Sequence, residues 1–254
     1  IKYPSIKIYI FKRKLQICIN FNKKRTAFKY VSDILYLARG DLEVIPTPYL
    51  LFLGDAPDQL SAKVAQGIKD WRPENAVGQI RMPGCNADIG LADLTLQQAF
   101  KKGAKTMVIG VANRGGYISE GWKAVLIEAL NTGFDLASGL HNLLRDEPDL
   151  VSCAEKNGRR LHDVRVPTVE YPIANGKKRS GKRCLAVGTD CSAGKMYTAM
   201  AMDRLMQERG MKSTFRATGQ TGILITGEGV PLDAVIADFM AGSIEYLTPN
   251  NEED

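Results

Sequence analysis

From residue 48 onward the sequence repeats one pattern, in which a short apolar run is followed by a turn with Gly or Asp and then by a stretch with helical spacing. This alternation is typical of α/β domains, where parallel strands form a sheet and helices cover it. It predicts strands at residues 48–53, 77–81, 106–111 and 134–138 and helices at 58–69, 94–102, 120–131 and 150–156. We therefore predict a Rossmann-like domain with an open parallel sheet over residues 46–165.

The second half of the chain continues the pattern after a break at residues 166–182. This break is rich in Pro, Gly and basic residues, and we interpret it as a solvated linker rather than a phosphate patch or a nuclear signal. The remaining residues, 183–254, form a second α/β domain in this interpretation, with strands at 184–187 and 213–217 and helices at 196–207 and 231–241. Because 72 residues are few for a doubly wound domain, we expect this second domain to be incomplete.

A glycine-rich loop follows the first expected strand of the second domain and leads directly into its first helix. It consists of Gly188, Thr189, Asp190, Cys191, Ser192, Ala193, Gly194 and Lys195. Such a loop turns backbone N–H groups inward, and the helix end and the lysine add positive charge, so a phosphate is the expected ligand. The spacing differs from a standard P-loop by one extra residue, and Met196 stands where Ser or Thr would hold Mg²⁺. A tight turn without a ligand is the alternative.

Three further groups of polar residues follow expected strands, where ligands bind in open α/β sheets. Arg216, Thr218, Gln220 and Thr221 follow the strand at 213–217, and Asn113, Arg114 and Gly115 follow the strand at 106–111. We predict that Arg216 and Arg114 bind anions, with neutral hydrogen bonds from the other side chains. His141 follows the strand at 134–138 and is a candidate base. The alternatives are a surface turn for the group at Arg216, a helix-capping turn with a solvated Arg for the group at Arg114, and a structural role for His141.

The net charge of +6 is concentrated at one end of the chain. The first 30 residues contain nine Lys or Arg and no Asp or Glu, so the other 224 residues carry a net charge of −3. We therefore expect no nucleic-acid partner and interpret residues 1–45 as an atypical basic extension without function, the alternatives being a nucleic-acid arm and an organelle presequence. The alternating apolar residues of this extension, up to Phe21, predict an edge strand or a sticky tail.

Several classes of protein are excluded by what the sequence lacks. No run approaches the ~18 apolar residues that cross a membrane, and no secretory signal precedes residue 30, so we expect a cytoplasmic protein without a membrane partner. The five cysteines form no CxxC pair and the two histidines no metal-binding spacing, so we expect no transition-metal site.

The glycine-rich loop resembles that of dethiobiotin synthetase and its P-loop relatives. The chain as a whole resembles the DgcN-type D-glutamate N-acetyltransferase family over residues 46–250, a two-domain family with a Rossmann-like domain and a P-loop domain. The segments that carry this resemblance are residues 48–74, GVANRGG at 110–116, GTDCSAGK at 188–195, FRATGQTGILI at 215–225 and VPLDAVIADFMAG at 230–242. Members of that family continue beyond the point where this chain ends.

The resemblance implies transfer of an acetyl group from acetyl-CoA to the amine of an acidic D-amino acid such as D-glutamate. In that case the loop around Lys195 would hold the phosphates of CoA, and Gln220 and Thr221 would also bind this cofactor. Arg216 or Arg114 would hold the carboxylates of the substrate, with Asn113 and Gly115 beside Arg114. Asp190 and His141 are then candidate bases, and Thr218 a candidate donor to the oxyanion. Two alternatives are an ATP- and Mg²⁺-dependent ligase of the dethiobiotin synthetase type and a noncatalytic nucleotide-binding module. We also expect a homo-oligomer, because a truncated sheet leaves apolar surface exposed.

Overall fold

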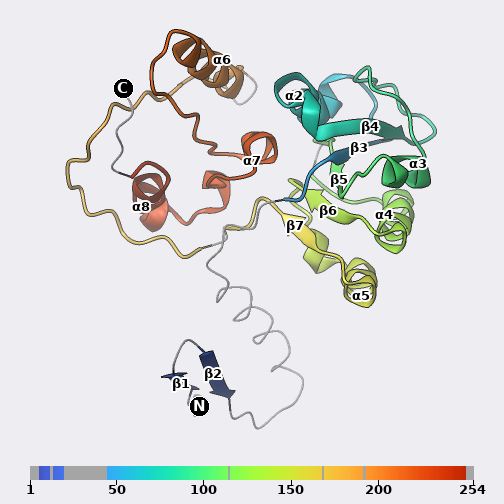
Figure 1. Ribbon diagram of the computed structural model, residues 1–254, viewed down its shortest axis with the longest axis horizontal. Coiled ribbons are helices and arrows are strands. Elements are labelled where there is room, and N and C mark those ends of the chain that lie inside the picture. The colour runs from blue at the N-terminus through green and yellow to red at the C-terminus, as the bar shows by residue number, and fades with distance from the viewer. Residues whose placement is uncertain are drawn as a thin grey trace. The chain divides into compact units, whose positions relative to one another are not determined.

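The computed structural model describes residues 6–11, 14–19, 45–113, 115–167, 169–190 and 193–249 (Figure 1). Residues 1–42 and 43–254 belong to two separate units. In the first unit, β1 (Ile6–Phe11) pairs antiparallel with β2 (Lys14–Ile19), so that Ile6 lies opposite Ile19. The alternating pattern thus forms strands as predicted, although its last member, Phe21, lies outside the described residues.

The second unit is built around a parallel sheet, as predicted. Its strands are β3 (Tyr49–Gly54), β4 (Ala76–Arg81), β5 (Thr106–Ile109), β6 (Asp135–Ser138) and β7 (Leu161–Asp163), in the order β4-β3-β5-β6-β7. Every neighbouring pair in this sheet is parallel. Strand β7 was not predicted, because it has three residues, two of them polar, and so lacks an apolar run.

Helices connect these strands and begin and end at the residues that the local sequence favours. They are α2 (Lys63–Trp71), α3 (Leu96–Lys101), α4 (Glu120–Thr132) and α5 (Pro148–Asn157), with single 3-10 turns at Leu60–Ala62, Pro73–Asn75 and Leu144–Asp146. Thr95 and Gln98 form a capping box before α3, and the Ser119 hydroxyl accepts from the backbone of α4. Gly133 ends α4 in the left-handed conformation, which glycine adopts without strain.

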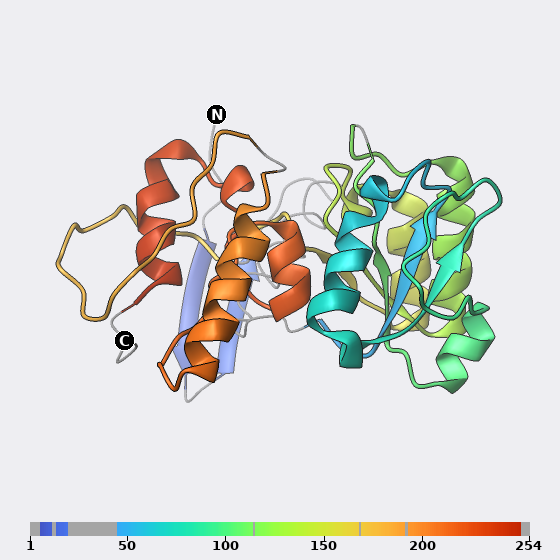
Figure 2. The same ribbon diagram turned by 90° about the horizontal axis from the view of Figure 1, so that it is seen from above.

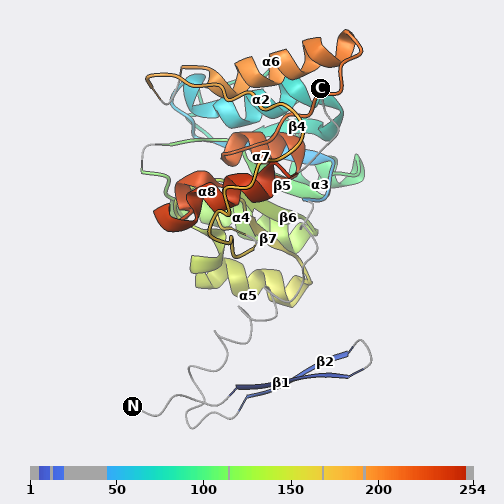
Figure 3. The same cartoon turned by 90° about the vertical axis from the view of Figure 1, so that its left-hand side faces the viewer.

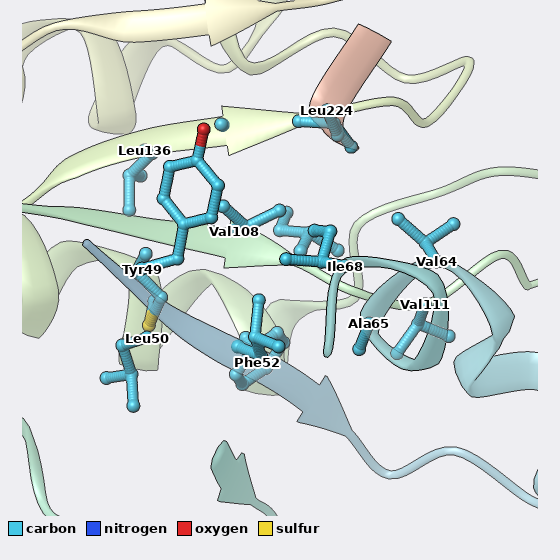
Figure 4. Close-up of a cluster of buried hydrophobic side chains, with 14 of the residues drawn as sticks. Tyr49, Leu50, Phe52, Val64, Ala65, Ile68, Val108, Val111, Leu136 and Leu224 are labelled. Carbon is cyan, nitrogen blue, oxygen red and sulfur yellow. The ribbon is translucent and has the colours of Figure 1, made fainter. Parts of the chain in front are cut away.

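The core lies on both faces of this sheet. All six residues of β3 are buried, as expected for a central strand of a parallel sheet. Val64, Ala65 and Ile68 of α2 pack against the sheet, and Leu224, from the second half of the chain, joins the same cluster (Figure 4). Helices α3, α4 and α5 lie on the other side of the sheet from α2 (Figure 2).

The second half of the chain contributes three helices and, in its described residues, no strand. They are α6 (Lys195–Glu208), α7 (Gln220–Thr226) and α8 (Ala237–Leu247), with a 3-10 turn at Leu232–Ala234. Helix α6 matches the prediction, whereas the helix expected at 231–241 was placed too early. The segments predicted as strands at 184–187 and 213–217 have no ladder partners among the described residues, and Leu185 and Val187 are exposed. An apolar run cannot form a strand unless a neighbouring strand pairs with its backbone.

The predicted solvated linker is partly tied to α8. Asn175 and Gly176 donate their backbone N–H groups to the Glu245 carboxylate, both at 2.9 Å. The guanidinium group of Arg179 donates to the hydroxyl of Thr248 at 2.6 Å, and Pro172 passes directly against Gly242. Most residues of this segment are nevertheless exposed, in agreement with a solvated linker. Two neighbouring basic residues, Lys177 and Lys178, are exposed as expected.

Candidate functional site

The strand order places a topological switch point between β3 and β5. The chain leaves β3 toward β4 on one side and continues from β5 toward β6 and β7 on the other. In open α/β sheets, the crevice at the carboxyl ends of two such strands is where ligands bind. The loops that begin after Gly54 and after Ile109 therefore frame the first candidate region.

Beside β3, Asp55 is fixed in place by the indole ring of Trp122. The indole Nε1 donates to the Asp55 carboxylate at 2.7 Å, and the same ring lies edge-on to Phe52 with 5.3 Å between centroids. Gly54 allows this approach, because a Cβ atom at that position would lie 2.6 Å from the indole. Asp55 and Trp122 are 67 positions apart, so the local sequence pattern does not predict this contact.

Beside β5, the loop at 110–116 folds into a tight turn. Ala112 donates its N–H to the Ser61 carbonyl at 2.8 Å, and Gly116 donates to the Asn113 carbonyl at 3.2 Å. The side-chain amide of Asn113 donates to the Tyr117 carbonyl at 2.9 Å, whereas its oxygen is shielded from solvent and has no hydrogen-bond partner among the described residues. Arg114, the predicted anion-binding residue, lies outside the described residues, and Gly115 forms the exposed corner of the turn.

The loop after β6 packs directly on this turn through His141. A Cβ atom on Gly116 would lie 2.8 Å from the backbone nitrogen of His141 and 2.9 Å from its imidazole Cδ2. The next residue, Asn142, donates its N–H to the Gly116 carbonyl at 2.8 Å and accepts from the N–H of Ile118 at 3.3 Å. The structure therefore brings the predicted residues Asn113, Gly115 and His141 together.

A charged pair between Lys123 of α4 and Glu147, the N-cap residue of α5, supports these two loops. The Asn142 amide donates to Glu147 at 3.2 Å, and Glu147 pairs with Lys123 at 2.9 Å. Both charged side chains are largely buried, at 17% and 16% exposure. The hydrogen bond from Lys123 lowers the pKa of Glu147, and Glu147 and Glu120 in turn raise the pKa of Lys123. Sequence reasoning did not identify this pair, because its partners are 24 positions apart.

Helix α7 begins at the same edge of the sheet. The side chain of Gln220, its first residue, lies against Gly139, where its amide donates to the Gly139 carbonyl and accepts from Arg165 Nη1 at 3.2 Å. Arg165 in turn pairs with Asp233. Sequence reasoning missed this role for Arg165, and it missed α7 itself. Gln220, predicted to bind the cofactor, thus contacts the first domain.

The glycine-rich loop leads into α6 as predicted, although no strand precedes it. Gly194 is the N-cap residue in the left-handed conformation, no side chain caps the helix and its first turn contains no acidic residue. Lys195 donates to the Asp190 carbonyl, and its alkyl chain lies against Gly188, where a Cβ atom would lie 3.2 Å from Lys195 Cγ. Thr189 and Ala193 are exposed parts of this loop, while Cys191 and Ser192 lie outside the described residues.

Helix α6 docks on α2, so the glycine-rich loop is held near the first domain (Figure 3). Tyr197 stacks on Trp71 with 6.2 Å between ring centroids, and its hydroxyl donates to the Lys63 carbonyl at 3.2 Å. The guanidinium of Arg204, two turns further along α6, lies 4.3 Å from the centre of the Trp71 ring. This packing fixes the direction in which the amino end of α6 points.

The polar group predicted after residues 213–217 begins in the segment that connects α6 with α7. Gly222 of α7 touches the segment before it and also α6, because a Cβ there would lie 3.0 Å from Ala217 and 3.5 Å from Met196 Sδ. Arg216 Nη1 lies 3.9 Å from the Glu228 carboxylate, and the Thr218 carbonyl accepts from the N–H of Leu232 at 3.3 Å. Thr221 packs its methyl group toward Gly67 of α2. Helix α7 thus contacts the first domain through Gln220 and helix α6 through Gly222.

Two features are absent from the part of the chain that the structure describes. There is no group of three or more His, Cys, Asp or Glu residues that could hold a metal ion. No described helix is both long and apolar enough to cross a membrane. Cys85, Cys153 and Cys184 are free thiols.

Comparison with known families matches both halves of the chain. Residues 81–167 match DUF1611_N, a Rossmann-like domain of unknown function, and residues 172–254 match the DUF1611 P-loop domain of unknown function. A crystal structure of a DUF1611 family protein from Anabaena variabilis superposes with a TM-score of 0.70 at 30% identity, covering 80% of this chain and 62% of that one.

Two curated relatives share a name. A D-glutamate N-acetyltransferase from Tritonibacter scottomollicae is 76% identical over 211 residues, which are 83% of this chain. A second, from a Pseudoalteromonas species, is 47% identical over 209 residues, or 82% of this chain. The chain spans 63% of the length of each of these relatives.

Proposed function

The chain belongs to the DUF1611 family, and from this premise we propose that it acts in N-acetyl transfer, moving an acetyl group from acetyl-CoA to the amine of D-glutamate or a similar acidic D-amino acid. The observation that carries the proposal is the 76% identity to a D-glutamate N-acetyltransferase over 83% of this chain. Because the chain spans 63% of that relative, residues outside it could complete the site.

We assign the phosphates of CoA to the glycine-rich loop and the amino end of α6. This end fits an anion because its backbone N–H groups have no side-chain cap and no acidic residue neighbours them in the first turn. Lys195, held over the loop by its contact with Gly188, adds a positive charge. Met196 in place of a hydroxyl residue favours a phosphate ligand over a magnesium-bound nucleotide. Thr189 to Gly194 supply the remaining backbone donors.

We assign the substrate to the edge of the sheet beside β5 and β6, with Arg216 or Arg114 for its carboxylates. The ammonium group must lose a proton before its nitrogen can attack the acyl carbon, and His141 or Asp190 would accept that proton. The carbon–nitrogen bond then forms, the carbon–sulfur bond breaks and the thiolate of CoA leaves. Backbone N–H groups or the Thr218 hydroxyl would stabilise the developing oxyanion.

The test is release of CoA from acetyl-CoA in the presence of D-glutamate, run beside calorimetric titrations with acetyl-CoA and with Mg-ATP. Turnover that depends on D-glutamate is the expected result, together with binding of acetyl-CoA. If the protein binds Mg-ATP but does not bind acetyl-CoA, the result would instead support a ligase of the dethiobiotin synthetase type. Tight nucleotide binding without turnover would indicate a noncatalytic module.

We further propose that the protein works in the cytoplasm as a homo-oligomer. Support for the second part comes from apolar side chains that are exposed in the second half of the chain, among them Leu185 at 77%, Val187 at 79% and Ile236 at 69%. Exposed apolar surface of this kind favours association. Light scattering coupled to size exclusion tests it, and a monomer at micromolar concentration would refute this part of the proposal.

A further inference from the structure

Asp55, the residue that follows β3, carries an exposed carboxylate of which one oxygen is engaged within the described part of the chain. Its Oδ1 accepts from the indole Nε1 of Trp122 at 2.7 Å. No described residue donates to Oδ2, and no described Lys or Arg pairs with this carboxylate. A carboxylate in this state is an accessible acceptor for a ligand that carries a positive charge.

The contact between Asp55 and Trp122 spans the switch point of the sheet. Asp55 begins the loop from β3 to α2, whereas Trp122 lies in the first turn of α4, the helix that follows β5. Helices α2 and α4 lie on opposite sides of the sheet, so the chain diverges between these two strands (Figure 2). In sheets with this strand order, the ligand lies between those two strands at their carboxyl ends. The accessible oxygen of Asp55 is therefore in the place where a ligand is expected.

The carboxylate is held in one orientation before a ligand arrives. Trp122 is buried, at 3% exposure, and its ring lies edge-on to Phe52 with 5.3 Å between the ring centroids. The backbone of Gly54 has a φ of +53°, and a Cβ atom there would lie 2.6 Å from the indole, so the ring and the turn fit together because this residue is glycine. A preorganised charge of this kind binds its partner at a smaller cost in conformational entropy.

The charge of the loop favours a cation over a phosphate. Residues 55–62, all of them described, include two Asp and no Lys or Arg. Asp58 holds the start of the next helical turn, because its Oδ1 accepts from the N–H of Ser61 at 2.8 Å and from the Ser61 hydroxyl at 2.9 Å. The charge of Asp55 repels the phosphate that the corresponding loop binds in dinucleotide-binding sheets. An ammonium group fits this place better.

We propose that Asp55 binds the ammonium group of the acidic amino acid through Oδ2 and that Trp122 is its positioning residue, an inference that rests on the proposed function. At neutral pH this substrate has two carboxylates, which Asp55 repels, and one ammonium group, which it attracts. The contact therefore sets the direction in which the substrate binds, with its nitrogen beside β3 and its carboxylates turned away from Asp55. Glutarate, which has both carboxylates but no amine, should gain nothing from Asp55.

The test compares D-glutamate with glutarate by calorimetric titration into the full chain at saturating CoA. The unaltered protein should bind D-glutamate at least about tenfold more tightly than glutarate. Asp55→Asn keeps the acceptor for the indole and removes the charge. D-glutamate should then bind at least about tenfold more weakly, whereas glutarate and, in a separate titration, acetyl-CoA should bind no more weakly than before.

Asp70→Asn is the matched control. Asp70 is an exposed carboxylate on α2 that also accepts one side-chain hydrogen bond, from Gln66 at 2.8 Å. This variant should keep the preference for D-glutamate. Trp122→Phe tests the positioning role, since phenylalanine keeps an aromatic ring in the core and removes the donor. D-glutamate should bind about threefold more weakly to it, with glutarate unchanged. Unchanged affinity for D-glutamate overturns the role of Trp122.

Equal affinities of the unaltered protein for the two ligands overturn the inference while the proposed function stands. The same holds if Asp55→Asn binds D-glutamate normally or loses both ligands equally, because a purely structural role would affect both alike. If the unaltered chain does not bind D-glutamate at all, the proposed function fails and the inference fails with it. Should Asp55→Asn not fold, Asp55→Ser removes the charge and keeps a hydroxyl acceptor, and the same comparison decides.

Discussion

Gly116 lies directly against His141, with so little space that a Cβ atom would come within 2.8 Å of the His141 backbone nitrogen. The backbone of Gly116 also has a φ of +60°, in the left-handed region that favours glycine. Gly116→Ala should therefore lower the free energy of unfolding by about 2 kcal/mol or more, combining backbone strain with the clash. It should also displace His141 and reduce acetyl transfer if that residue is the base. Urea denaturation and a CoA-release assay measure the two effects.

Gly115 provides the matched control, because it shares the backbone conformation without the contact. Its φ is +83°, and a Cβ there would lie 3.7 Å from the Tyr117 ring, an ordinary contact distance. Gly115→Ala should cost about 1 kcal/mol from backbone strain alone. Equal losses in the two variants would contradict the steric role assigned to the Gly116 contact.

Because of the ion pair between Glu147 and Lys123, the free energy of unfolding should depend on pH. The hydrogen bond from Lys123 lowers the pKa of Glu147 below its ordinary 4.5, so the ionised form is favoured in the folded state. The stabilisation that ionised Glu147 provides is fully present above the pKa that this residue has in the unfolded chain. It is lost as the pH falls through the lower pKa of Glu147 in the folded state. Glu147→Gln should therefore cost about 1 kcal/mol at pH 7, and the difference from the unaltered protein should shrink below pH 4.5.

Glu120→Gln tests whether burial is what matters, since Glu120 also pairs with Lys123 at 2.9 Å but its side chain is 87% exposed. Solvent screening should make this variant nearly neutral at every pH. Urea denaturation from pH 3.5 to pH 7 measures both variants. A pH-independent deficit in Glu147→Gln would argue for a packing effect instead of an ionic one.

The sequence predicted the sheet wherever buried runs were long and uninterrupted. Residues 48–53 and 106–111 contain such runs, and both form central strands. Helix α7 was missed for the opposite reason: it starts in a Gly-rich stretch, and its buried run Ile223, Leu224 and Ile225 reads equally well as a strand. At residues 184–187 a run of the right kind forms no strand among the described residues, because strand formation depends on partners that local sequence does not encode.

The candidate site was predictable in its loops but not in its contacts. Gly or polar residues after strands marked Asn113, His141 and the glycine-rich loop, because a parallel sheet brings the carboxyl ends of its strands to one edge. Such reasoning does not identify the residues that hold these loops. Lys123 reaches Glu147 from another helix, and Gln220 reaches Gly139 across 81 positions, so both contacts exist only once the tertiary fold is formed.

Arg179 should stabilise the end of α8. Its guanidinium donates to Thr248 Oγ1 at 2.6 Å and to the Ile244 and Glu245 carbonyls at 3.4 Å, and these acceptors lie at the carboxyl end of the helix, where a positive charge is favourable. Arg179→Met keeps most of the alkyl chain and removes the donors, so it should lower the free energy of unfolding by about 1.5 kcal/mol. Lys178→Met, at the exposed neighbouring position, should change it little. Urea denaturation of both variants is the measurement, and equal stability would contradict the capping role.

Lys195 and Arg216 should affect different ligands if their proposed roles are correct. Lys195→Ala removes a charge from the phosphate-binding end of α6 and should weaken acetyl-CoA binding at least about tenfold, with a smaller effect on D-glutamate. Arg216→Ala should raise the KM for D-glutamate by a similar factor and leave acetyl-CoA affinity unchanged. Lys101→Ala, on the surface of α3, should change neither constant. Calorimetry with acetyl-CoA and steady-state kinetics with D-glutamate separate the two roles, and normal values in both variants would refute them, because neither side chain would then contact a substrate.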